Sequence, residues 1–320
     1  MSEHTPILYI VVPCYNEQEA LPGSHERLHE LLSTMKSQSL VSQESRLLYV
    51  DDGSRDDTWS IIERLAAGGN DVAAVKLACN SGHQNALVAG LAAAVEHCDI
   101  TVSIDADLQD DINVIPSMVE HYKQGCDIVF GVRRERKTDS WFKRTSAGMF
   151  YRLMNRLGVD TINNHADYRL MSRRAVLALL DYRERNLFIR GIVTKLGYKS
   201  ACVYYDRSAR LAGESKYPLR KMLNFAVDGI TSFSVKPVRM VFMVGVLFLL
   251  VALIMLIYVL TAYFMGRAVS GWPSLILSVW LVGAFVLIGL GIIGEYVGKI
   301  YTEVKNRPRY NVDTTIGLDQ

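Results

Sequence analysis

The sequence predicts an α/β domain built on a mostly parallel sheet, followed by a hydrophobic hairpin. Short apolar runs alternate with helical patterns over residues 7–131, and this alternation is typical of βαβ units. Polar clusters follow directly after several of the apolar runs. Two long uncharged stretches come later in the chain. Together these observations predict a ligand site along one edge of a sheet and a membrane anchor.

The elements of the α/β domain are expected to alternate strictly. Each helical pattern lies between two apolar runs, so that each helix should connect two parallel strands. The expected strands are 7–12, 47–50, 72–78, 100–104 and 127–131, and the expected helices are 17–36, 56–67, 83–97 and 112–124.

Polar residues gather where the expected strands end. The clusters are Pro13-Cys14-Tyr15-Asn16-Glu17, Asp51-Asp52-Gly53-Ser54, Asn80-Ser81-Gly82-His83 and Asp105-Ala106-Asp107. Ligands of open α/β sheets bind at the carboxyl ends of the strands. None of these strand ends carries GxGxxG or GxxxxGK[ST], which argues against the dinucleotide-binding and P-loop classes. We therefore expect a nucleotide ligand of another kind, and we expect His83 to be an ordinary loop histidine rather than a metal ligand.

Asp105 and Asp107 stand one residue apart at the end of the fourth expected strand. Two carboxylates in this position can hold Mg²⁺, which prefers oxygen ligands and often keeps a substrate phosphate in its shell. Turn chemistry is the alternative, because aspartates in loops also hydrogen-bond to nearby backbone. The metal interpretation points to a cation that binds a diphosphate.

The uncharged stretches Met240–Gly266 and Ala268–Gly294 each exceed the roughly 20 residues that cross a bilayer as a helix. Basic residues flank the pair on its outer sides, whereas the connecting loop carries only Arg267. By the positive-inside rule, both termini and the α/β domain should face the cytoplasm. The polar start of the chain indicates no signal peptide.

The expected organisation has four parts. They are an α/β domain over 1–216, a juxtamembrane amphipathic helix over 217–236, a two-helix transmembrane hairpin over 237–298 and a cytosolic tail over 299–320. Within the first part, basic and apolar residues mix over 140–158, which favours a helix lying at the membrane interface. Packing of this segment on the domain core is the alternative.

The amino-acid composition by itself excludes few classes of function. The formal net charge of +2 is uninformative, and the local basic clusters matter more. We expect no nucleic acid to bind. The five cysteines are scattered and form no CxxC, so they are expected to be reduced thiols.

Several short motifs are spread along the chain. They are Val12-Pro13-x-Tyr15-Asn16-Glu17, Asp51-Asp52-Gly53-Ser54-x-Asp56, Asn80-x-Gly82, Asp105-Ala106-Asp107-Leu108-Gln109, Gly131-x-Arg133, Asp167-Tyr168-Arg169-Leu170, Arg210-x-x-Gly213-Glu214-Ser215-Lys216, Gly294-Glu295-Tyr296-x-Gly298 and Arg307-Pro308-x-Tyr310. Jointly they resemble family 2 glycosyltransferases of the inverting GT-A type. The likeness is greatest to the polyprenyl-phosphate glycosyltransferases, which include bactoprenol glucosyltransferases and dolichol-phosphate mannose synthases.

The resemblance implies a metal site and a donor site. Asp105, Asp107 and Gln109 would bind Mg²⁺ or Mn²⁺ beside the donor diphosphate, with Asp107 a catalytic residue. The donor-binding residues would be Pro13, Tyr15, Glu17, Asp52 and Asp105. For Asp52, helix capping is the alternative.

The resemblance also implies that basic side chains hold the phosphate of a lipid acceptor. The matched positions are Arg133, Arg210 and Lys216, with Arg144 a further candidate. A guanidinium group suits this task because its planar fork can bind two phosphate oxygens. A solvated surface charge is the alternative for any one of these residues.

Asp167 matches the acidic position of the family that would be catalytic, either as a base or by orienting the acceptor. The alternative is a structural salt bridge to Arg169 or Arg173. Two departures from the family pattern bear on the site. His165-Ala166 precedes Asp167, and Asp110-Asp111 adds charge near the metal where proline is usual after the first aspartate.

The implied activity is inverting transfer of a single hexose from a UDP-sugar, with UDP-glucose the expected donor, to undecaprenyl phosphate for modification of a cell-surface polymer. The alternatives are another sugar such as N-acetylglucosamine, a processive polysaccharide synthase, and a non-catalytic membrane scaffold that binds nucleotide sugars. Implied partners are membrane lipid, a flippase and a downstream transferase. Homo-oligomers are expected to pack through Gly283, Gly289, Gly291 and Gly294. The protein would be a multi-pass protein of the cytoplasmic membrane.

Overall fold

The computed structural model describes two compact units, which are treated separately. The first unit comprises Met1–Tyr151, Asp160–Tyr217 and Arg307–Gln320, and the second comprises Arg152–Val159 and Pro218–Asn306. The described residues are 5–134, 165–182, 184, 189–206 and 271–318, with scattered positions between 238 and 265.

An eight-stranded sheet forms the centre of the first unit. Its strands are β1 (Leu8–Cys14), β2 (Arg46–Asp51), β3 (Val72–Leu77), β4 (Ile100–Ser103), β5 (Ile128–Arg133), β6 (His165–Ser172), β7 (Ser200–Tyr205) and β8 (Val312–Ile316). Their order is β7-β5-β6-β4-β1-β2-β3-β8. Strand β6 runs antiparallel to β4 and β5, and β8 runs antiparallel to β3, whereas the other ladders are parallel. The predicted α/β class with a mostly parallel sheet is confirmed.

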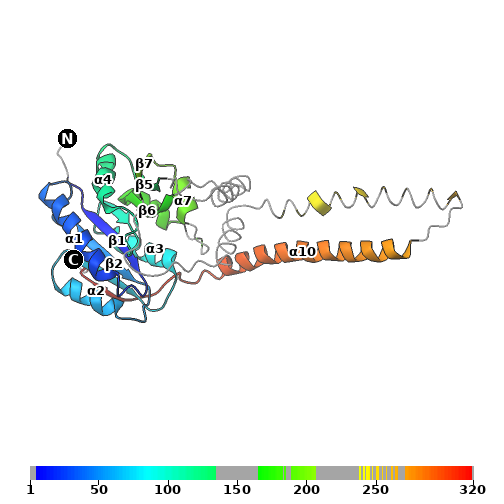
Figure 1. Ribbon diagram of the computed structural model, residues 1–320, viewed down its shortest axis with the longest axis horizontal. Helices are drawn as coiled ribbons and strands as arrows, with labels where there is room; N and C mark the ends of the chain where they lie inside the picture. The colour runs from blue at the N-terminus through cyan, green and yellow to red at the C-terminus, as the bar shows by residue number, and fades with distance from the viewer. Residues whose placement is uncertain are drawn as a thin grey trace. The chain divides into compact units, whose positions relative to one another are not determined.

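Helices cover both faces of this sheet (Figure 1). They are α1 (Leu21–Ser37), α2 (Thr58–Ala67), α3 (His83–Ala94), α4 (Ile115–Lys123), α6 (Arg173–Leu180) and α7 (Ile189–Lys195), with a 3-10 turn η1 (Ile112–Val114) before α4. Helices α1 and α2 pack on β2, α3 packs on β1 and β2, and α4 packs on β5, β6 and β7. Every residue of β1 is buried, as expected for a strand covered on both faces.

The predicted strands and helices between residues 7 and 131 all occur, with ends that differ by a few residues. Helix α1 begins at Leu21 rather than at residue 17, because a turn precedes it in which Asn16 has a positive φ of 54°. The five cysteines are all described and all free, as predicted.

Strand β8 was not predicted and lies within the segment expected to be a tail. It pairs with β3 from Ala74↔Ile316 to Leu77↔Val312. The guanidinium group of Arg46 donates a hydrogen bond to the carbonyl oxygen of Gly317 just beyond the strand. The chain therefore returns to the sheet after the second unit and covers the β3 edge.

The second unit contains α10 (Trp272–Val304), a helix of 33 residues. Its segment Leu281–Val304 is long and apolar enough to cross a membrane, and it is the one such helix among the described residues. A Cβ atom on Gly289 would lie 3.2 Å from Cγ1 of Val241, so the first apolar stretch contacts α10 there. The structure thus supports one of the two predicted spans. Most of the other span, and the segments 140–158 and 217–236, lie outside the described residues.

Close packing of α3 on the sheet depends on a glycine. A Cβ atom on Gly90 would lie 2.5 Å from Cγ1 of Val11 and 2.6 Å from Cγ2 of Val50. Both valines are completely buried in strands and cannot move away easily. Gly90 therefore sets the distance between α3 and the sheet, and with it the position of the helix N-terminus.

We predict that Gly90→Val lowers the free energy of unfolding by about 1–3 kcal/mol, because the added methyl groups overpack this interface. Gly23→Val is the matched control, since no atom lies within 4 Å of a Cβ atom there. Its effect should stay within about 0.5 kcal/mol. Thermal or denaturant unfolding of the purified variants measures both. Equal stability of the two variants would contradict the packing argument.

Candidate functional site

The topology brings the polar strand ends to one edge of the sheet. Strand β1 has β2 on one side and β4 on the other, so the strand order reverses between β1 and β4. Ligands of open α/β sheets bind beside such a reversal. Because β6 is antiparallel, its first residues reach the same edge, and Asp167 joins the residues that follow the parallel strands.

The turn after β1 is fastened to the loop after β2. The backbone N–H of Asn16 donates to Ser54 Oγ at 3.0 Å, and the Asn16 side chain accepts from the N–H of Arg55 at 2.9 Å. The N–H of Glu17 donates to Thr58 Oγ1 at 2.9 Å. The predicted donor turn is therefore held in one conformation by side chains of the neighbouring loop.

The three predicted donor residues of this turn differ in exposure. Pro13 is buried within β1, Glu17 is half-buried and Tyr15 is exposed. Cys14 is buried, and burial raises the pKa of its thiol well above the ordinary value. Tyr15 and Glu17 thus remain the residues of the turn that a ligand could reach from solvent.

Asp52 holds the N-terminus of α3. Its two carboxylate oxygens accept hydrogen bonds from the backbone N–H groups of Ser81, at 2.7 Å, and Gly82, at 2.9 Å. Burial raises the pKa of Asp52, and these two hydrogen bonds partly offset that effect. These hydrogen bonds hold the loop that leads into α3, and no described side chain caps the first turn of α3 or of α2. Contact of Asp52 with a nucleoside stays a prediction.

Gly53 allows the loops after β2 and β3 to touch. Its φ is 65°, and a Cβ atom on it would lie only 2.7 Å from the backbone nitrogen of Asn80. Gly82 has a φ of 90°, and a Cβ atom added to it would have no other atom within 4 Å. Only glycine suits either conformation readily. The space beside Gly82 leaves its backbone uncovered by other described atoms.

A tight turn presents the two aspartates predicted to bind metal. Leu108 has a positive φ of 42° and is buried, an uncommon conformation for a residue with a side chain. The Gln109 side-chain amide donates to Asp107 Oδ2 at 2.5 Å. Gln109 therefore holds Asp107, while the Asp105 side chain remains 44% exposed.

These residues fit a cation shared with a substrate better than an all-protein cage. Among the described residues, no group of three or more His, Cys, Asp and Glu side chains is arranged to hold a metal ion. Mg²⁺ is usually bound by one or two carboxylates together with substrate phosphates. The Asp105 and Asp107 carboxylates supply that donor set.

Asp167 is buried among three basic side chains. Its carboxylate is paired with Arg169 and accepts from Arg190 Nη2 at 3.0 Å and Nε at 3.3 Å. The His83 Nε2 atom lies 3.7 Å from Asp167 Oδ2 and 3.6 Å from Asp105 Oδ1. His83 therefore links the predicted catalytic aspartate to the predicted metal ligand.

The charges of this cluster perturb each other. Burial would raise the pKa of Asp167, but His83, Arg190 and Arg169 hold it well below its ordinary value. Arg169 is almost completely buried, and its Nε and Nη1 atoms have no hydrogen-bond partner among the described residues. The predicted salt-bridge alternative is present for Arg169.

Arg173 takes no part in this cluster and instead pairs with Glu96 at 3.4 Å. That half of the predicted salt-bridge alternative is therefore wrong. The Asp167 cluster draws its second guanidinium group from Arg190, in α7.

Arg133, predicted to bind the acceptor, is anchored by Asp110. Its Nε atom donates to Asp110 Oδ1 at 3.0 Å and its Nη2 atom to Oδ2 at 3.2 Å. The hydroxyl of Tyr205 lies 3.3 Å from the same Nε atom. Asp110 is thereby neutralised by an arginine, while Asp111 caps the turn η1 by accepting from Asn113 N–H at 3.0 Å.

Three predicted acceptor residues, Arg144, Arg210 and Lys216, lie outside the described residues. Two residues now found at the site had no predicted role there. The expected loop position is wrong for His83, which is the first residue of α3 and lies near both Asp105 and Asp167. The place of His83 in the strand-end cluster Asn80-Ser81-Gly82-His83 was the available sequence signal, whereas no sequence signal pointed to Arg190.

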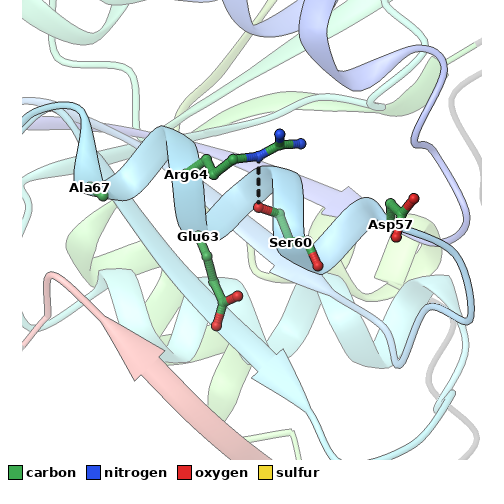
Figure 2. Close-up of a pocket in the computed structure, with 5 residues that line it drawn as sticks. All are labelled: Asp57, Ser60, Glu63, Arg64 and Ala67. Atoms are coloured by element: carbon green, nitrogen blue, oxygen red, sulfur yellow. Dashed lines mark hydrogen bonds between the residues drawn. The ribbon is translucent and has the colours of Figure 1, made fainter.

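A hollow of about 580 Å³ lies elsewhere, along α2 (Figure 2). It is lined by Asp57, Ser60, Glu63, Arg64 and Ala67, all on or next to one helix. The Arg64 Nε atom donates to the carbonyl oxygen of Ser60, one turn earlier in α2, at 3.3 Å (Figure 2). None of the predicted site residues lines this hollow.

Similarity to known proteins extends over the whole chain. The Glycosyl transferase family 2 model matches residues 9–180. The uncharacterized glycosyltransferase YkoT of Bacillus subtilis is 49% identical over 320 residues, which cover 100% of this chain and 95% of that protein. The SfII prophage-derived bactoprenol glucosyl transferase of Shigella flexneri is 40% identical over 308 residues, which cover 94% of this chain and 96% of that protein.

Among solved structures, the mannosyltransferase PcManGT from Pyrobaculum calidifontis, in complex with GDP-Man and Mn²⁺, aligns with 96% of this chain and 89% of its own. The sequence identity is 15% and the TM-score is 0.44. The family model and the full-length relatives carry the assignment. The chain therefore belongs to glycosyl transferase family 2 and is a glycosyltransferase with a mostly parallel α/β domain.

Proposed function

We propose that the protein transfers a single glucose from UDP-glucose to undecaprenyl phosphate, with inversion at the anomeric carbon. The product would be a lipid-phosphate-linked sugar for modification of a cell-surface polymer, after the action of a flippase and a downstream transferase. The observation that carries this proposal is the full-length similarity, at 40% identity, to proteins named bactoprenol glucosyl transferase. Bactoprenol is the undecaprenyl carrier.

On the donor side, Asp105 and Asp107 would face the diphosphate, and Gln109 would keep Asp107 in place or join it as a ligand. Mg²⁺ or Mn²⁺ bound there would neutralise charge on the leaving nucleoside diphosphate as a Lewis acid. The turn with Tyr15 and Glu17 would contact the nucleotide. Support comes from the exposure of these groups at one sheet edge and from the hydrogen bonds that fix the turn.

On the acceptor side, the phosphate monoester is largely ionised near pH 7, since its second pKa is about 6. It needs cations and alignment more than it needs a base. Arg133 would supply one cation, and Arg144, Arg210 and Lys216 would supply others. The anchoring of Arg133 by Asp110 supports this role, because it fixes the guanidinium group at the same edge as Asp105.

The acceptor lipid implies a membrane location. The apolar segment Leu281–Val304 supports an anchor in the bilayer. We propose a second span over 240–266, with both termini and the transferase domain on the cytosolic side of the cytoplasmic membrane.

N-acetylglucosamine or another sugar is the alternative donor group, because such sugars differ from glucose by one or a few substituents.

The proposal predicts sugar transfer by the purified full-length protein. With Mg²⁺ and undecaprenyl phosphate, UDP-glucose should give a labelled lipid product and release UDP faster than UDP-N-acetylglucosamine or UDP-galactose does. Extraction of radiolabelled lipid measures the product. Preference for another UDP-sugar would change the donor assignment, and failure of every donor would contradict the proposed reaction.

A second prediction concerns the metal ligands. Asp107→Ala should reduce transfer by about 1,000-fold or more while leaving the fold intact, since several kcal/mol of charge stabilisation would be lost. Asp111→Ala is the matched control. It removes another carboxylate from the same loop, and that carboxylate caps η1. Excess EDTA should abolish sugar transfer by the wild-type protein. Turnover that survives EDTA would contradict the metal assignment.

A further inference from the structure

The Asp167 carboxylate has its oxygens occupied. Oδ1 is paired with Arg169 and Arg190, and Oδ2 accepts from Arg190 and lies near His83. A general base must reach its substrate and should have a pKa near the working pH. Asp167 is buried, and its basic neighbours hold its pKa far below the ordinary value. Its geometry instead suits the task of fixing its partners in position.

Arg190 is the partner that reaches solvent. Its side chain is 37% exposed, whereas that of Arg169 is 1% exposed. Arg190 uses Nε and Nη2 to hold Asp167, and its Nη1 atom has no hydrogen-bond partner among the described residues. The backbone is fixed as well, because the N–H of Ile189 donates to Gln84 Oε1 at 3.3 Å. A cation fixed by its partners, with one donor that is unpaired within the described part of the chain, thus lies at the sheet edge.

The same arrangement occurs at Arg133. Each arginine is anchored through Nε and Nη2 by a buried aspartate, Asp110 or Asp167, and for each Nη1 no partner is found within the described ranges. Two guanidinium groups that are each anchored by a buried carboxylate suit the binding of an anion between or beside them.

Arg190 interacts electrostatically with Arg133 and with the predicted metal ligand Asp105. Burial lowers the pKa of Arg190, Asp167 and Asp105 raise it, and the like charge of Arg133 lowers it. Arg190 is therefore close to both the metal-binding edge and the predicted acceptor cation. An anionic group that enters this space would relieve the repulsion between the two guanidinium groups.

We propose that Arg190 binds an ionised phosphate oxygen during the reaction and that Asp167 is its positioning residue. This inference rests on the proposed transfer reaction and adds a phosphate-binding group to it. The phosphate belongs either to the donor diphosphate or to the lipid acceptor, which carry the same chemistry. His83 completes the arrangement by bracing Asp167 against Asp105.

The test is Arg190→Gln in the full-length protein, with KM measured separately for UDP-glucose and for undecaprenyl phosphate. Loss of one charged hydrogen bond should raise one of the two KM values by about 10- to 100-fold. A rise for the lipid assigns Arg190 to the acceptor, and a rise for UDP-glucose assigns it to the donor. Unchanged values of both would overturn the inference.

Arg174→Gln is the matched control. Arg174 also holds a buried aspartate, Asp127, through Nε and Nη2, but Asp127 directly precedes β5 at the opposite edge of the sheet. This variant should lose a similar ion pair and keep both KM values. If it shows the same KM change as Arg190→Gln, the effect is one of stability and the inference fails.

Asp167→Asn separates positioning from base catalysis. It should raise the same KM as Arg190→Gln, and it should add little in the Arg190→Gln background, because the two residues act as one unit. A fall in kcat with KM unchanged would overturn the positioning role. Should Asp167→Asn not fold, Arg190→Gln still decides the inference.

Failure of the proposed reaction can be told apart from failure of this inference. If the wild-type protein transfers no sugar, the proposed function fails. Equilibrium binding of UDP with Mg²⁺, and of undecaprenyl phosphate, then compares wild type with Arg190→Gln without turnover. Weaker binding of either compound to the variant supports the inference, and equal binding of both overturns it.

Discussion

Buried carboxylates at the edge of the sheet must find partners, and the site depends on this constraint. Asp52, Asp110 and Asp167 are all buried, and an unpaired charge there would cost several kcal/mol. Each is satisfied by a different part of the chain: the backbone before α3, Arg133 at the end of β5, and Arg169 and Arg190 on β6 and α7. The pairing fixes the loops relative to one another.

The pairing also separates structural carboxylates from those a ligand can reach. Asp105 and Asp107 stay partly exposed between the paired groups. Arg133 and Arg190, which pair with Asp110 and Asp167, are themselves partly exposed. A site with this distribution favours a ligand that brings both a cation and phosphate groups, which is what a nucleotide-sugar transferase requires.

Much of the fold could be predicted because its strands are short apolar runs followed by polar turns. Strand β6 was missed since charged and apolar residues alternate in it, and the burial of Arg169 makes sense only beside Asp167. Strand β8, Val-Asp-Thr-Thr-Ile, is polar and exposed and forms because β3 offers an open edge. Neither pairing is local in the sequence.

The strand-end residues of the site could be predicted for the same reason, as the tips of parallel strands share one edge. The cationic partners could not. His83 and Arg190 are more than 100 residues apart in the sequence, and only the packing of α3 and α7 against the sheet brings them to Asp167. Asp52 likewise accepts hydrogen bonds from the loop before α3, which lies beyond the next strand, and no local sequence pattern predicts this contact.

The central claim is that Asp105 and Asp107 bind a metal that carries the donor diphosphate at this edge. An experimental structure with UDP and Mn²⁺, in which anomalous scattering locates the metal, tests it most directly. We predict a Mn²⁺ peak about 2 Å from carboxylate oxygens of Asp105 or Asp107, with the diphosphate on its other side. A metal and UDP bound elsewhere, for example in the hollow along α2, with both aspartates unligated, would contradict the account.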